Sequence, residues 1–139
     1  MFLDTSVVVK LLVRENDSPH YLGLAKGHDI KICDLAVTEV LSALMIKERT
    51  KEITMPIRAE AWEKFNNRLR LNYYTVLPVT VSAFRKAEQF ILRCYPKVAL
   101  RAMDALHLAV CDLHQAFPLI TDDEKMRAAA GHFGIPVLH

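Results

Sequence analysis

The chain has 139 residues, of which 52% are hydrophobic and 24% are charged, with only four glycines and six prolines. This composition excludes a disordered or low-complexity chain and predicts a single domain over residues 1–139, without a linker or a second core. The formal net charge of +2 is too small to indicate a nucleic-acid-binding protein by itself.

Short apolar strand patterns alternate with longer helical patterns, which predicts βα units and a mainly parallel sheet in an α/β fold. The expected strands lie at residues 1–4, 30–33, 75–79, 118–121 and 137–138. The first two expected helices begin near residues 5 and 18, and a third, capped by Asp34, runs to about residue 49. The others run at about 56–71, from residue 80 or 82 to 95, 100–115 and 123–132.

Four acidic residues are set far apart in this pattern: Asp4, Glu39, Asp104 and Asp123. Asp4 ends the first expected strand, Asp123 follows the fourth, and Glu39 and Asp104 fall in the first turns of helices. Ligands of open parallel sheets bind beyond the carboxyl ends of the strands, where the strand order reverses. If the first and fourth strands are neighbours at that point, the four acids converge.

Each of these acids has apolar neighbours, although Asp and Glu are almost never fully buried unless something pairs with them. No matching set of Lys or Arg stands beside them in the sequence. Two carboxylates about 4 Å apart near a protein surface repel each other by roughly 4 kcal/mol, so a cluster must take up protons or hold a cation. A divalent metal ion is the simpler answer, because Mg²⁺ and Mn²⁺ prefer oxygen ligands.

Four motifs carry a family resemblance: Met-Phe-Leu-Asp-Thr-Ser at residue 1, Val-Thr-Glu-Val at residue 37, Arg-x-x-Asp-Ala-Leu-His-Leu-Ala at residue 101, and Leu-Ile-Thr-Asp-Asp-Glu-Lys-Met at residue 119. Together they resemble the PIN-domain nucleases, in particular the VapC-type ribonuclease toxins of bacterial toxin–antitoxin pairs. The motifs occur in order over nearly the whole chain. The resemblance implies a three-layer α/β/α sandwich and endoribonuclease activity that depends on Mg²⁺ or Mn²⁺.

Carried over by position, the family acids fall on Asp4, Glu39, Asp104 and Asp123, with Asp122 as an alternative to Asp123. We expect Asp4 and Asp104 to be the primary metal ligands, and Glu39 and Asp123 to complete the shell or to orient the attacking water. The hydroxyls expected to support these acids are those of Thr5, Ser6 and Thr121. For Thr5 and Ser6, a helix N-cap is an equally good reading.

Basic residues are concentrated just before the third motif, where residues 85–101 contain five Lys or Arg and a single acid. Such a run is more often a solvated helix face than a binding surface. A polyanionic substrate nevertheless needs cations beside an acidic site. Arg93, Lys97 and Arg101 are therefore the expected RNA-binding residues, and Arg101 lies one helical turn before Asp104.

Other interpretations of these residues lead to different functions. Singly, each acid is as well explained as a helix cap, an ion-pair partner or a solvated residue. His107, Cys111 and His114 share a helix face but lack a zinc-site motif, so burial is the better reading. No Gly-x-Gly-x-x-Gly follows the first strand, and no acceptor Asp ends the third, which disfavours dinucleotide-binding and phospho-accepting domains. A catalytically silent PIN-fold module and an RNA-processing nuclease without an antitoxin remain open.

The sequence also supports expectations about the cellular compartment and the partners of the protein. Cys33, Cys94 and Cys111 stand in apolar surroundings, which predicts reduced, buried thiols and a cytoplasmic protein. The apolar first 13 residues include Asp4 and Lys10 and are too short to span a bilayer, so neither export nor membrane insertion is expected. The resemblance implies RNA as substrate, a cognate antitoxin as inhibitory partner, and a homodimer.

Overall fold

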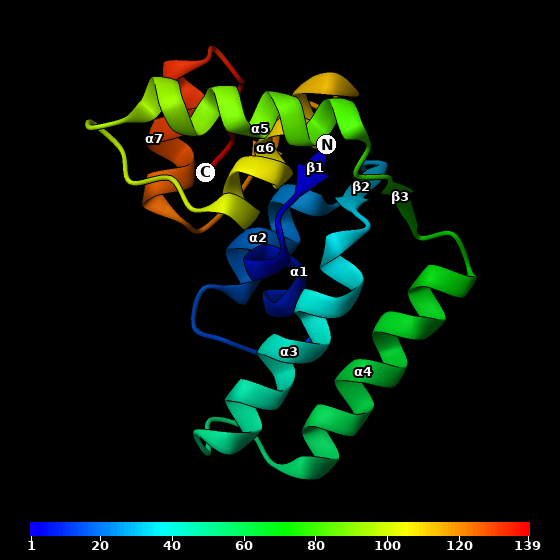
Figure 1. Ribbon diagram of the computed structural model, residues 1–139. Coiled ribbons are helices and arrows are strands. Elements are labelled where there is room, and N and C mark those ends of the chain that lie inside the picture. The colour runs from blue at the N-terminus through cyan, green and yellow to red at the C-terminus, as the bar shows by residue number, and fades with distance from the viewer.

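The computed structural model describes residues 1–139 as four strands and seven helices (Figure 1). The strands are β1 (Phe2–Leu3), β2 (Ile30–Cys33), β3 (Tyr74–Leu77) and β4 (Leu119–Ile120). The helices are α1 (Thr5–Lys10), α2 (Ser18–Ala25), α3 (Leu35–Arg49), α4 (Met55–Arg70), α5 (Val81–Cys94), α6 (Ala102–Leu113) and α7 (Glu124–His132). Every strand is followed by at least one helix, as the alternating sequence pattern predicts.

All four strands are parallel, in the order β3-β2-β1-β4. The central strand β1 pairs Phe2 with Lys31 of β2 on one side and with Leu119 of β4 on the other. The chain builds outward from β1 to β3 and then crosses back to β4, so the strand order reverses between β1 and β4. The expected adjacency of the first and fourth strands is therefore confirmed, and the ligand position typical of such sheets lies at their carboxyl ends.

Helices cover both faces of the sheet, which confirms the three-layer α/β/α sandwich. Successive side chains of a strand point to opposite faces. Phe2 and Leu119 accordingly enter an apolar core with α5, α6 and α7, whereas Leu3 and Ile120 enter a second core with α1 to α4. The sheet therefore separates two cores and holds β1 and β4 rigidly between them.

Helices α3 and α4 pack side by side and extend away from the rest of the molecule (Figure 1). Helix α4 starts with a proline in its first turn, where the missing N–H costs nothing. Arg58 Nε of α4 lies 2.7 Å from Glu48 Oε2 of α3. At the base of this pair Phe65 is fully buried, with its ring centroid 5.7 Å from that of Trp62 and 5.7 Å from that of Tyr74.

Three local expectations were wrong. Residues 137–138 form no strand, because only an isolated bridge joins Val137 to Leu119. Strand β3 ends at Leu77, since Pro78 has no N–H for the ladder. Asp34 stands at the N-cap of α3 without capping it, and its Oδ2 instead accepts a hydrogen bond from the Val79 amide at 3.2 Å.

The three cysteines are free and buried, as the sequence predicts. Burial raises the pKa of the Cys33 and Cys111 thiols to about 12, so both thiols stay protonated at neutral pH. No helix of the structure combines the length and the apolar character that a membrane-spanning helix needs.

Replacing Phe65 with Ala removes a fully buried ring from the core beneath α3 and α4. We expect the free energy of unfolding to fall by about 3–5 kcal/mol, from lost transfer energy and the cavity left behind. Leu92→Ala is the control, because Leu92 is 75% exposed and its loss changes stability by less than about 0.5 kcal/mol. Urea unfolding followed by circular dichroism measures both, and equal midpoints for the two variants would contradict this packing.

Candidate active site at the carboxyl edge of the sheet

Asp4 leaves β1 at the carboxyl edge and forms the N-cap of α1, with extended backbone (φ −76°, ψ 171°). Its Oδ1 accepts hydrogen bonds from the Ser6 hydroxyl at 2.6 Å and the Val7 amide at 3.1 Å. Its Oδ2 accepts one from the Thr121 hydroxyl at 2.5 Å, which ties the end of β1 to the end of β4. The side chain is thus a cap and a rigid carboxylate at once, and Oδ2 keeps a free lone pair.

Glu39 reaches the same edge from the second turn of α3, one turn later than the sequence pattern suggests. A single carboxylate oxygen, Oε2, accepts both of its hydrogen bonds. The Thr5 hydroxyl lies 2.5 Å away, and Nε2 of His107 on α6 lies 2.7 Å away. The other oxygen, Oε1, has no protein partner.

Asp104 and Asp123 complete the set. Asp104 is half-buried in the first turn of α6 and makes no hydrogen bond to the protein. Asp123 forms the N-cap of α7, where its Oδ1 accepts a hydrogen bond from the Met126 amide at 2.8 Å. The Asp123 amide in turn donates to the Thr121 hydroxyl at 3.1 Å, so the same threonine contacts both Asp4 and Asp123.

Three of the acids share one electrostatic environment. Burial raises the pKa of Asp4 above its ordinary value, despite hydrogen bonds from Ser6 and Thr121 that act to lower it. The pKa of Asp104 is raised first by burial and then by the nearby charges of Asp123 and Asp4. Asp123 and Asp4 are therefore close enough to Asp104 to oppose its ionisation.

Glu39 behaves in the opposite way. Burial acts to raise its pKa, but hydrogen bonds from His107 and then Thr5 outweigh burial and hold the pKa below the ordinary value. Glu39 is therefore the acid of the set whose negative charge the protein itself stabilises.

Both carboxylate oxygens of Asp122 have partners outside the acidic set. Its Oδ2 lies 3.0 Å from the Lys10 ammonium, and its Oδ1 accepts a hydrogen bond from the Tyr21 hydroxyl at 2.9 Å. Burial acts to raise the pKa of Asp122, but these two partners lower it below its usual range. Lys10 also pairs with Glu15 at 3.1 Å and Asp17 at 2.7 Å, so Asp122 belongs to an ion-pair network beside the acidic set.

The donor chemistry fits a hard cation. The acidic set offers carboxylate and hydroxyl oxygens, and Asp104, Oε1 of Glu39 and Oδ2 of Asp123 have no protein partner. No group of three or more His, Cys, Asp or Glu side chains is arranged to hold a metal ion by itself in this structure. Mg²⁺ does not require such a cage, because it usually keeps several waters and binds through one or two carboxylates and substrate phosphates.

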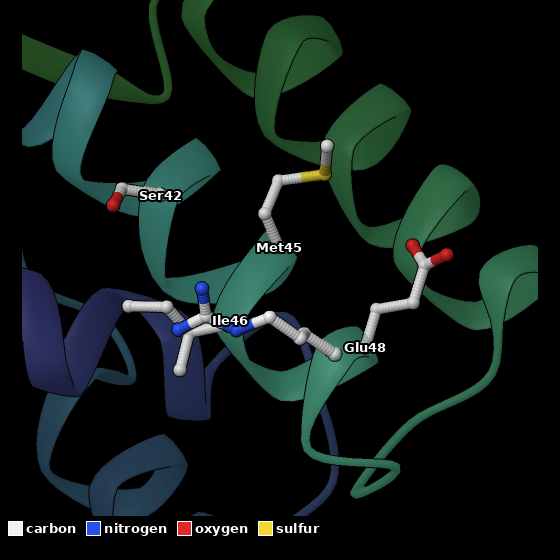
Figure 2. Close-up of a pocket in the computed structure, with 5 residues that line it drawn as sticks. Ser42, Met45, Ile46 and Glu48 are labelled. Carbon is white, nitrogen blue, oxygen red and sulfur yellow. The ribbon is translucent and has the colours of Figure 1, made fainter.

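A cavity of about 510 Å³ opens beside Glu39, and its lining also includes Thr5, Lys10, Ile46 and Asp122. A second cavity, of about 500 Å³, adjoins it on α3 and shares Ile46 with it. Figure 2 shows Met45 and Glu48 on the side of α3 that faces α4, in the wall of this second cavity. Through Glu39, the acidic set therefore borders a groove with apolar side chains along α3.

The expected RNA-binding residues are all exposed, at the end of α5 and the start of α6. The Arg93 guanidinium lies over the Phe133 ring, 4.9 Å from its centroid. Lys97 and Arg101 form no ion pair, and the Arg101 charge acts to lower the pKa of Asp104. Arg101 is thus the cation of this group with a direct electrostatic effect on an acid of the set.

Sequence reasoning missed three residues of this region. His107 was weighed only as a zinc ligand or buried residue, although it lies one helical turn after Asp104 and so on the same face of α6. Lys10 was noted only as a charge in an apolar run. A lysine inside an apolar run is itself a sequence signal, because a buried ammonium group needs acidic partners. No sequence signal indicates the hydrogen bond between Tyr21 and Asp122, which are 101 residues apart.

A parallel sheet between two helical layers, with acidic side chains gathered where its strand order reverses, defines an α/β/α sandwich protein with an acidic site. The family model for the PIN domain matches residues 1–132. The chain belongs to the PIN-domain family. No curated protein sequence matches the chain as a relative.

Solved structures with the same fold are distant in sequence. A toxin–antitoxin complex from Klebsiella pneumoniae is 19% identical with a TM-score of 0.64, over 99% of this chain and 95% of that chain. VapC20 of Mycobacterium tuberculosis, described as a Sarcin-Ricin loop cleaving toxin, is 18% identical with a TM-score of 0.68, over 92% and 93%. FitAcB from Neisseria gonorrhoeae is 18% identical with a TM-score of 0.67, over 99% and 96%. At these identities the similarity establishes the fold.

Asp104→Asn is expected to stabilise the metal-free protein at neutral pH. The folded-state pKa of Asp104 is raised, so its ionisation costs stability as pH rises from the unfolded-state pKa of about 3.9 through the folded one. The variant should therefore melt a few degrees higher at pH 7 in EDTA, and the difference should vanish near pH 4. Differential scanning calorimetry across this pH range measures it.

Asp122→Asn is the matched control with the opposite sign. The folded-state pKa of Asp122 is lowered, so its charge contributes stability above the unfolded-state pKa, and this stability is lost as pH falls through the folded one. Because the Asp122 side chain is 41% exposed, we expect this variant to lose no more than about 1 kcal/mol at pH 7. If the melting temperatures of Asp104→Asn and Asp122→Asn shifted in the same direction at pH 7, the electrostatic difference between the two positions would be contradicted.

Proposed function

We propose that this protein is a metal-dependent endoribonuclease and the toxin of a type II toxin–antitoxin pair. The observation that carries the proposal is the placement of Asp4, Asp104 and Asp123 at the strand-order reversal of a PIN-domain fold, where the charges of Asp123 and Asp4 raise the pKa of Asp104. Membership of the PIN-domain family and the fold shared with toxin structures support it.

In this proposal Mg²⁺ or Mn²⁺ is held by Asp4 and Asp104, and Glu39 and Asp123 bind directly or through water. When bound, the cation lowers the pKa of a water and stabilises negative charge on the phosphate. The free carboxylate oxygens of Glu39 and Asp123 orient the water that attacks phosphorus, and one of them accepts its proton. Thr5, Ser6 and Thr121 hold the acids in position through the hydrogen bonds described above.

We propose Asp123, rather than Asp122, as the fourth acid. Asp122 has an ammonium on one oxygen and a tyrosine hydroxyl on the other, so binding a cation would require breaking an ion pair. Asp123 uses only Oδ1 for its cap and raises the pKa of Asp104 by its charge. The fourth acid is thus the one that shares a charge environment with the other ligands.

RNA is the proposed substrate. VapC20, which shares the fold, is described as a Sarcin-Ricin loop cleaving toxin. Unpaired bases in loops are the usual targets of sequence-specific RNA recognition. Arg93, Lys97 and Arg101 are proposed to contact phosphates on the side of the site nearest α5 and α6.

The proposed inhibitory partner is a cognate antitoxin. The groove beside Glu39 continues onto α3, where Met45 and Ile46 are 51% and 46% exposed (Figure 2). A segment laid along that groove would cover apolar surface and block the acids together. One of the structures that share the fold is a toxin–antitoxin complex. A homodimer and a cytoplasmic location belong to the same proposal.

The adjacent residues Asp122 and Asp123 allow a sharp test of the proposed nuclease activity, because only Asp123 is assigned to the site. The purified protein, freed of any partner, is incubated with end-labelled total RNA in Mn²⁺ or Mg²⁺. We expect discrete cleavage that EDTA abolishes and that Asp123→Asn slows by about 100-fold or more, within the range for loss of a group acting in the transition state. Asp122→Asn should stay within a few-fold of wild type, because Asp122 serves the ion-pair network.

Cleavage that survives both Asp123→Asn and Asp104→Asn would come from a contaminant and would overturn the proposed site. Equal loss in Asp122→Asn and Asp123→Asn would reject the assignment of the fourth acid. Absence of cleavage in a folded protein that binds Mn²⁺, tested against total RNA, would favour a catalytically silent module.

Arg101→Ala tests the proposed phosphate contact. We expect KM for a short RNA to rise about 3–10-fold with a much smaller change in kcat, and the logarithmic salt dependence of kcat/KM to weaken by about 1. Arg85→Ala is the control, because Arg85 is exposed and pairs with Glu88 on its own helix. An unchanged KM in Arg101→Ala would exclude Arg101 from the RNA-binding surface.

A further inference from the structure

His107 is an unusual buried residue at the edge of the acidic set. It is 3% exposed, and its Nε2 lies 2.7 Å from Glu39 Oε2. The Thr5 hydroxyl donates to that same Oε2, whereas Oε1 has no protein partner. The donors on Glu39 are therefore gathered on one oxygen, and the other is left open.

The ring can act in only one orientation. Nδ1 of His107 is buried without any hydrogen-bond partner. An ionised carboxylate only accepts hydrogen bonds, so the hydrogen that joins the two side chains is carried by Nε2. The ring edge also packs against Phe2, with centroids 6.1 Å apart and planes 71° apart. Packing in the β1 core thus fixes the imidazole, and the imidazole fixes the carboxylate.

We propose that His107 is a positioning residue that holds Oε2 of Glu39 so that Oε1 remains available to the bound cation or to its water. This inference rests on the proposed nuclease function, because it assigns a role within that site. Helix α6 then contributes twice, directly through Asp104 and indirectly through His107 one turn later.

A flexible glutamate gains from such restraint. Glu39 has three rotatable side-chain bonds and is only half-buried, so it loses rotamer freedom when it binds a cation. Donors that orient metal ligands are commonly worth 10–100-fold in metal affinity. Thr5 alone cannot supply this restraint, because a single hydroxyl leaves the carboxylate free to rotate about that contact. The imidazole provides the second fixed point.

Two amide variants separate positioning from packing. In His107→Gln the side-chain nitrogen reaches about as far as Nε2, whereas in His107→Asn it ends near the position of Nδ1 and cannot reach Glu39. Mn²⁺ dissociation constants are measured by isothermal titration calorimetry, well below the melting temperatures of the metal-free proteins. We expect His107→Gln to stay within about 3-fold of wild type and His107→Asn to bind about 10-fold more weakly or worse. His114→Asn, at the exposed end of the same helix, should bind as wild type does.

The outcomes distinguish the two proposals. Equal Mn²⁺ affinities in His107→Gln and His107→Asn, with wild type binding Mn²⁺ and cleaving RNA, would overturn the role of His107 and leave the nuclease intact. Equal weakening of both variants together with equal loss of melting temperature would show a purely structural histidine. A wild-type protein that neither binds Mn²⁺ nor cleaves RNA would overturn the proposed function and this inference with it.

Discussion

Repulsion between carboxylates at one edge of the sheet is the constraint on which the rest of the site depends. The charges of Asp123 and Asp4 raise the pKa of Asp104, and no Lys or Arg forms an ion pair with any of the three. A fold that gathers such charges must pay for them in stability unless a cation binds. The two buried cores that clamp β1 and β4 supply the rigidity that keeps the charges together.

Hydroxyl groups and helix N-termini reduce that repulsion without removing the charges. Asp4 and Asp123 each cap a helix with Oδ1, where the first-turn amides and the helix dipole favour a negative charge. Thr121 contacts both residues and couples their positions. Capping and cation binding are therefore compatible uses of one side chain, because each occupies a different oxygen or lone pair.

The regular elements and the acidic positions were readable from the sequence, whereas the contacts around them were not. The 30–33 strand follows from a short, largely apolar run and from βα alternation, whereas the pairing of β1 with β4 was an assumption about topology that the structure confirms. Thr121 was named, but its bond to Asp4 spans 117 residues, which no local pattern encodes. For Asp34 the local pattern was misleading. An Asp is a suitable N-cap residue at this position, but its side chain accepts a hydrogen bond from the distant Val79 amide instead.

Asp122 and Asp123 are distinguished by the charged residues that the fold places beside each of them, and not by their positions in the sequence. The two residues are chemically identical and contiguous, yet they belong to different networks. The difference originates in Lys10, which α1 places next to Asp122 and away from bulk solvent.

The same network determines which cations remain for a polyanion. Lys10 is enclosed by Glu15, Asp17 and Asp122, and Lys47 by Glu15 and Glu52, so these two ammonium charges are neutralised locally. Lys97 and Arg101, near the start of α6, have no acidic partner within ion-pair distance. Under the proposed function, Lys97 and Arg101 would attract a substrate phosphate from the α6 side, while the partly apolar surface of α3 suits a protein segment. The acidic edge of the sheet is thus bordered by two chemically different surfaces, a cationic one near α6 and a partly apolar one on α3.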